Sequence, residues 1–110
     1  MYIIYLYLML IYCLLQLRVD LSKAIPVDIN RLDIIKCCEY DNNKILLSLP
    51  IKLTMNPNER NVDSIIKDLN ILIQNKEITP ISWFGTTNLL DANFGFQQTS
   101  KYAINLIMQI

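Results

Sequence analysis

The chain has no histidine and only two glycines, and these scarcities exclude several classes of enzyme. Without an imidazole it cannot build a Ser-His-Asp triad, a Cys–His dyad or a histidine-ligated metal site. Gly85 and Gly95 are too few for the glycine-rich loops that bind nucleotide phosphates. The sequence therefore predicts no catalytic, cofactor-binding or metal-ligating residue, and it favours a protein that works by binding over an enzyme.

One spacing resembles the start of a calcium loop, in which Asp91, Asn93 and Gly95 alternate with other residues. Phe96, however, stands at the position where such a loop needs its glycine, and Tyr102 stands where the bidentate glutamate belongs. A turn is the better interpretation of this segment.

The charges are few and balanced, with 10 basic and 10 acidic side chains. No basic run stands out, so a nucleic-acid partner is not expected. A hydrophobic content of 53% with 18% charged residues is typical of a folded domain. The length suffices for one small domain.

An almost unbroken apolar run, Tyr2 to Leu17, opens the chain. As a helix it would be roughly 24 Å long, against about 30 Å of bilayer hydrocarbon. Ser22-Lys23-Ala24 is a small-x-small triplet of the kind that signal peptidase accepts. We therefore expect residues 1–24 to be a signal peptide or membrane anchor, residues 25–110 to form one small domain, and the protein to be secreted or membrane-associated. An anchor would contact the membrane through residues 2–17, and a buried helix is the remaining alternative.

Residues 45–55 alternate between apolar and polar side chains, which predicts a half-buried strand. Residues 32–40 read as its antiparallel partner. Since Pro50 has no N–H to donate, we expect a four-residue loop over Asp41–Lys44 and a place for this strand at or near a sheet edge.

The rest of the chain predicts alternating helices and strands. Asn56 and Pro57 suit a helix start, and an apolar stripe follows at helical spacing until about Asn75. A strand over 77–84, a weaker strand over 89–96 and a last helix beginning at Thr99 or Ser100 complete the order. This gives an α+β fold, an N-terminal apolar helix followed by a β-β-α-β-(β)-α layer, with helices on one face of an antiparallel sheet. The apolar end also suits a chain truncated at its C-terminus.

Cys37 and Cys38 are adjacent on the first predicted strand. The expected register sends Cys38 into the core beside Leu47 and Cys37 outward beside Ser48. Two free thiols are the simplest interpretation. In an oxidising compartment, however, an exposed Cys37 would form an intermolecular disulfide and link a homodimer.

The best candidate for a recognition surface is the aromatic pair Trp83 and Phe84 with the polar residues Thr86, Thr87 and Asn88. The alternative is that Trp83 fills the core. Together these features predict a small exported, non-catalytic domain that binds another protein. A single-span membrane-anchored subunit and the N-terminal fragment of a larger exported enzyme remain as alternatives.

Overall fold

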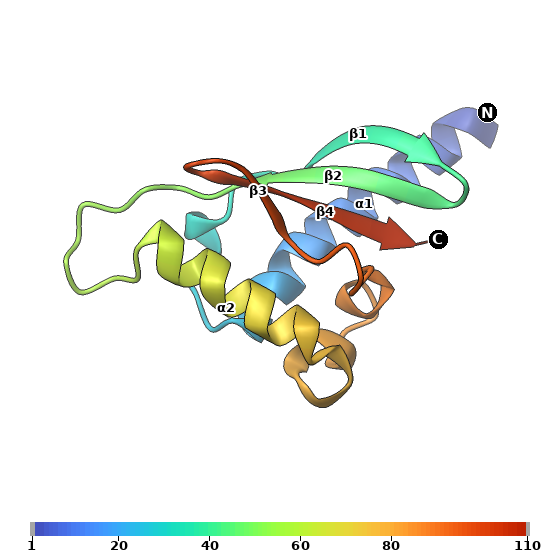
Figure 1. Ribbon diagram of the computed structural model, residues 1–110. Coiled ribbons are helices and arrows are strands. Elements are labelled where there is room, and N and C mark those ends of the chain that lie inside the picture. Colours follow the sequence, from blue (N-terminus) through green and yellow to red (C-terminus); the bar gives the residue numbers. More distant parts are fainter. Residues whose placement is uncertain (1, 110) are drawn as a thin grey trace.

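The computed structural model describes the backbone of residues 2–109 and their side chains, except those of residues 2, 3, 5–7 and 38. Two helices and four strands follow one another with short 3-10 turns between them (Figure 1). In chain order the helices and strands are α1 (Tyr2–Ala24), β1 (Lys36–Asp41), β2 (Lys44–Pro50), α2 (Val62–Gln74), β3 (Gln97–Ser100) and β4 (Ala103–Gln109). The predicted α+β class is confirmed.

The four strands form an antiparallel sheet in the order β1-β2-β4-β3. The alternation along β2 and β4 gives this sheet one fully apolar face, which both helices cover. Figure 1 shows α1 passing behind the sheet and α2 lying beneath it. The buried side chains of this face are Ile45, Leu47, Leu49, Ile104, Leu106 and Met108.

The two halves of α1 have different surroundings. The second half packs in the same core as the sheet, through Leu14, Leu17, Leu21 and Ala24. The first half continues to the end marked N in Figure 1 and presents apolar side chains to solvent. Among the described residues, we find no helix with the length and apolar character needed to cross a membrane.

The β1–β2 hairpin confirms the predicted antiparallel pairing, but β1 begins at Lys36 and not at residue 32, and β2 ends at Pro50 and not at residue 55. The loop also differs from the prediction. Asn42 and Asn43 have φ angles of 49° and 64°, so the turn has two residues in the left-handed region, and the four-residue prediction is wrong. Both are asparagines, which tolerate this conformation better than most residues. A bulge between Cys37 and Glu39 then shifts the register, so that Cys37 pairs with Leu47.

Pro50 ends β2, which lies next to the edge strand β1, in keeping with the prediction of a strand at or near a sheet edge; β4 pairs with its other side. The Pro50 carbonyl accepts the Asp33 N–H at 2.9 Å, so its nitrogen faces the same side. On that side residues 33–35 belong to no strand. The interruption of pairing at 33–35 thus accommodates the missing donor of Pro50.

Helix α2 begins later than predicted, at Val62. Its N-cap is Asn61, whose Oδ1 accepts the Ser64 N–H at 2.8 Å. Asn56 instead closes a separate turn, in which its Oδ1 accepts the Asn58 N–H at 2.9 Å. The apolar stripe and the end at Asn75 are as predicted; the buried residues are Val62, Ile65, Ile66, Leu69 and Ile73.

The predictions for the last third of the chain are largely wrong. Residues 76–89 form 3-10 turns instead of a strand, and residues 89–96 contribute one isolated bridge, between Leu90 and Met108. The expected final helix is the β3–β4 hairpin. Ala103–Gln109 forms a strand because β2 offers it a full ladder of backbone partners, which buries Ile104, Leu106 and Met108 at a period of two.

Candidate functional site

Residues 76–89 form a compact platform, which we call the three-turn platform. It consists of the 3-10 turns Lys76–Ile78, Pro80–Trp83 and Thr87–Leu89. Pro80 occupies the start of the second turn, where its fixed φ suits a helical conformation and its missing N–H has no partner to lose. The segment therefore belongs to neither a long helix nor a strand.

Side-chain hydroxyls hold the platform together by donating to backbone carbonyls. Thr79 Oγ1 donates to the Leu72 carbonyl at 2.8 Å and so ties the platform to the end of α2. Thr87 Oγ1 donates to the Ile81 carbonyl from a fully buried position. Such local bonds satisfy backbone groups that would otherwise need a helix or strand partner.

A further bond connects the platform to α1. Thr86 Oγ1 donates to Asp20 Oδ2 at 2.6 Å, and Gln16 Nε2 donates to Asp20 Oδ1 at 2.9 Å. Asp20 is buried, so both of its oxygens are satisfied by neutral donors from two elements. The platform is thus attached to both helices and presents its outer surface from a fixed position.

The last residue of each turn has an exposed apolar side chain. Trp83, the single tryptophan of the chain, is 73% exposed, and Ile78 is 83% exposed, while Leu89 is exposed to a smaller extent. Ile81 points inward and is fully buried. The alternative in which Trp83 fills the core is therefore wrong.

The other predicted surface residues separate into two groups. Asn88 is exposed beside the turn that ends at Leu89. Phe84 packs partly against the core, and Thr86 is half-buried by its bond to α1. Thr87 is wholly buried, so its role is to hold the platform and not to contact a ligand. The sequence analysis did not identify Ile78 and Leu89 as surface residues, because no periodic pattern around them indicates exposure.

The described cysteines have different environments. Cys37 lies exposed on β1, as predicted, but its partner across the sheet is Leu47 and not Ser48. The side chain of Cys38 lies outside the described part. Cys13 is half-buried, and burial followed by the charge of Asp20 raises the pKa of its thiol. Cys13 is therefore a poor nucleophile.

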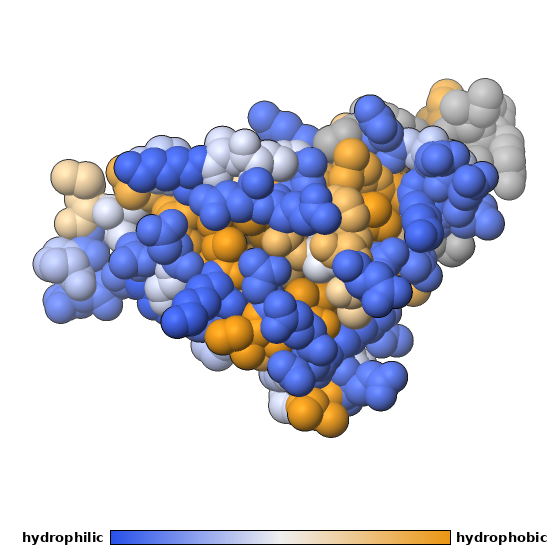
Figure 2. All heavy atoms as spheres, in the orientation of Figure 1, coloured by the Kyte–Doolittle hydropathy of each residue, from blue (hydrophilic) through white to orange (hydrophobic). Residues whose placement is uncertain are grey.

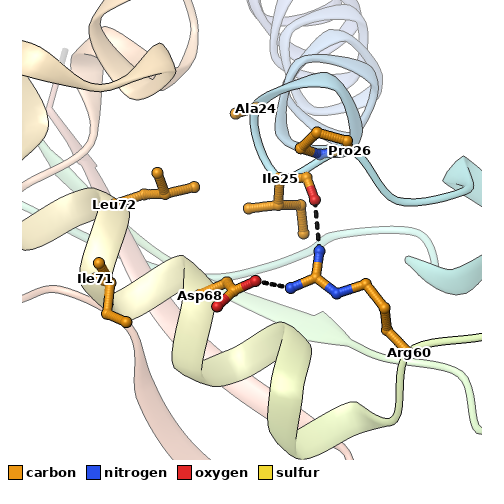
Figure 3. A pocket seen from close by; sticks show the side chains of 7 residues that line it. All are labelled: Ala24, Ile25, Pro26, Arg60, Asp68, Ile71 and Leu72. Carbon is orange, nitrogen blue, oxygen red and sulfur yellow. Dashed lines mark hydrogen bonds and ion pairs between the residues drawn. The ribbon is translucent and has the colours of Figure 1, made fainter.

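A cavity of about 350 Å³ lies between the end of α1 and α2 (Figure 3). Arg60 spans its mouth, donating to the Ile25 carbonyl at 2.7 Å and pairing with Asp68. Figure 3 shows that both bonds use the guanidinium and that apolar side chains make up the remaining wall. The charged groups that line the cavity are thus paired within the chain, and Arg60 links the end of α1 to α2.

The outer face of the sheet has a hollow of about 420 Å³, and Leu46 and Ile107 are among the residues that line it. Figure 2 shows this apolar surface over β2 and β4, with hydrophilic residues around it. Next to it, Asp91 forms a turn in which Oδ1 accepts the Asn93 N–H at 2.9 Å, as the turn interpretation predicted.

The Asp91 carboxylate has a lowered pKa. Burial alone would raise it, but that effect is outweighed by hydrogen bonds from the Phe94 N–H, the Gln109 side chain and the Asn93 N–H and by the charge of Lys44. Within the described residues no group of three or more acidic, cysteine or histidine side chains comes together as a metal site.

Comparisons with protein-family models, with curated proteins and with solved structures find no match to this chain. Function must therefore be inferred from the chain's own residues.

Proposed function

We propose that this protein is a non-catalytic domain that binds another protein through the three-turn platform, with Trp83 as the central contact. The observation that carries the proposal is the exposure of the only tryptophan, 73% of whose surface faces solvent. Tryptophan is enriched among the few interface residues that dominate binding energy. A large aromatic side chain left in water gains most when a partner covers it.

The rigidity of the platform supports the same proposal. Buried Thr87 holds the turn that carries Trp83 through the Ile81 carbonyl, and Thr86 holds the platform against Asp20. A surface fixed in its binding conformation loses little entropy when it binds. Asn88, exposed beside the apolar residues, supplies the polar contacts of an interface rim.

We further propose that α1 stays attached to the domain and that the protein is membrane-associated. Cleavage after Ala24 would remove Leu14, Leu17 and Leu21 from the core. It would also remove Asp20, the carboxylate that holds Thr86. The proposed cleavage triplet itself lies in the helix, with Ser22 and Ala24 buried. N-terminal sequencing of the protein from its own cells tests this: a chain that begins at Ile25 would refute retention.

Selection from a random peptide-display library on the folded full chain tests the binding proposal. Peptides that bind should lose about 30-fold in affinity for Trp83→Ala, because truncating a central aromatic contact costs about 2 kcal/mol. Tyr40→Ala is the matched control, since Tyr40 is a similarly exposed aromatic side chain on β1. Peptides that bind Trp83→Ala and wild type equally would show that the platform is not the binding site.

A further inference from the structure

The exposed side of the first half of α1 is apolar where its side chains are described. Leu8, Met9, Ile11 and Tyr12 are all exposed, and they are consecutive except for Leu10. Because neighbouring helix residues point about 100° apart, these four side chains span an arc of roughly 160° on one side of the helix. Leu10 and Cys13, on the other side, pack against the core. An exposed apolar face of this width needs apolar surroundings to cover it.

The exposed segment also lacks charge. The sequence has no Asp, Glu, Lys or Arg before Arg18, and then Arg18, Asp20 and Lys23 follow within two turns. Arg18 donates to the Leu32 carbonyl at 2.6 Å and the Ile29 carbonyl at 3.0 Å. The charged residues of α1 thus begin within the part of the helix that packs in the domain.

A groove continues the apolar surface from the helix onto the domain. It lies between α1 and the segment leading into β1 and is lined by Ile11, Leu14, Leu15, Arg18, Ile34 and Ile35. Of these, Ile11, Leu15 and Ile34 are exposed. The domain therefore offers apolar side chains beside the helix at its own boundary.

We propose that the exposed side of the first half of α1 inserts into the surface of a lipid bilayer. A charge-free apolar face of this width suits the boundary between headgroups and acyl chains, where a helix lies with its apolar side buried by about 5–10 Å. Tyrosine, abundant in this segment, is enriched at membrane interfaces.

The chemistry also specifies the kind of lipid. Since the segment has no basic residue, binding depends on apolar burial and not on attraction to anionic headgroups. The full chain should therefore bind vesicles of pure phosphatidylcholine, and high salt should not release it.

Flotation of the full chain with phosphatidylcholine vesicles is the first test. Wild type should float, and Leu8→Glu/Tyr12→Glu should partition about 100-fold less, because two large side chains can no longer enter hydrocarbon. Leu53→Glu/Met55→Glu is the matched control, since both side chains are exposed in the loop before α2, and it should float like wild type. Circular dichroism should show all three proteins folded.

Fluorescence gives a second, independent readout. In Tyr12→Trp/Trp83→Phe the single indole lies on α1, and its emission should shift to the blue when vesicles are added. A folded wild type that does not float, or an indole at position 12 that stays solvated with vesicles, would overturn the proposal. Self-association without lipid, abolished by Leu8→Glu/Tyr12→Glu, would overturn it in favour of a second copy. None of these outcomes bears on peptide binding at Trp83, which is measured without lipid.

Discussion

The first half of α1 and the three-turn platform both expose apolar side chains, but they do so in different ways. The helix presents Leu8, Met9, Ile11 and Tyr12 without a charged residue among them. The platform presents a single large aromatic, Trp83, from turns that hydroxyl groups fasten to the protein interior. The first surface suits a fluid apolar phase and the second suits one shaped partner, so exposed apolar area alone does not identify what a protein binds.

The largest expected effect tests whether one side of α1 is part of the protein core while the other side is exposed. Leu17→Ala should lower the free energy of unfolding by about 2–5 kcal/mol, because Leu17 is fully buried and its removal leaves a cavity. Leu15→Ala, two residues away and about half-exposed, should cost well under half as much. Urea unfolding of both variants measures the difference. Equal, small effects would mean that α1 does not contribute to the core.

Thr87→Val sharpens the account of the platform. Valine has nearly the same shape but no hydroxyl, so the Ile81 carbonyl loses its donor and the free energy of unfolding should fall by about 1–3 kcal/mol. Peptide affinity should also fall, although Trp83 itself is unchanged, because the turn that carries it is looser. Unfolding by urea and peptide titration measure the two effects. If stability falls while peptide affinity stays at the wild-type value, platform rigidity does not contribute to binding.

Changing the pH should affect the fold next to the platform but not the exposed part of α1. Asp91 lies just past the platform, whereas the exposed part of α1 has no carboxylate. The folded-state pKa of Asp91 is lower than its unfolded value of about 3.9. Asp91 therefore stabilises the fold above that value, and this contribution is lost as the pH falls through the folded pKa. Asp91→Asn should be less stable at pH 7 by about 1 kcal/mol and should depend less on pH between 5 and 2.

Thermal unfolding of the two proteins across that pH range measures the difference. Vesicle flotation should stay constant over the part of the range in which the chain is folded. If Asp91→Asn and wild type lose stability in parallel, the lowered pKa of Asp91 does not contribute.

The smallest effect concerns Cys37. Cys37→Ser should leave stability nearly unchanged, because the side chain is exposed. If the exposed thiol links two chains under oxidising conditions, this variant should remove the dimer band on a non-reducing gel, whereas Cys13→Ser should keep it. A dimer band that persists in Cys37→Ser would assign the bond to another cysteine.

The parts of the fold that could be predicted are those with one dominant period. The stripe of α2 and the alternation of β2 each permit a single interpretation, and both are confirmed. The apolar residues of Ala103–Gln109 fit the spacing of a helix and of a strand. The segment forms a strand because it pairs with the side of β2 that β1 leaves free. Such a choice depends on a distant partner and cannot be read from the segment itself.

The platform could be predicted only in part for a related reason. Trp83 and Asn88 were recognised from their chemical types, but the orientation of Trp83 depends on 3-10 turns that have no periodic signature. The buried hydroxyl of Thr87 is satisfied by the Ile81 carbonyl, and nothing in the order of residues indicates that the two groups meet. Sequence patterns do not reveal local hydrogen bonds from hydroxyls to carbonyls, so the structure of the platform could not be predicted from them.

Acrylamide quenching of Trp83 fluorescence, with and without a selected peptide, tests the central claim most directly because the chain has one tryptophan. The account predicts a solvated indole that is strongly quenched in the free protein and shielded when the peptide binds. An indole that is already shielded in the free protein, or one equally quenched with and without bound peptide, would contradict it.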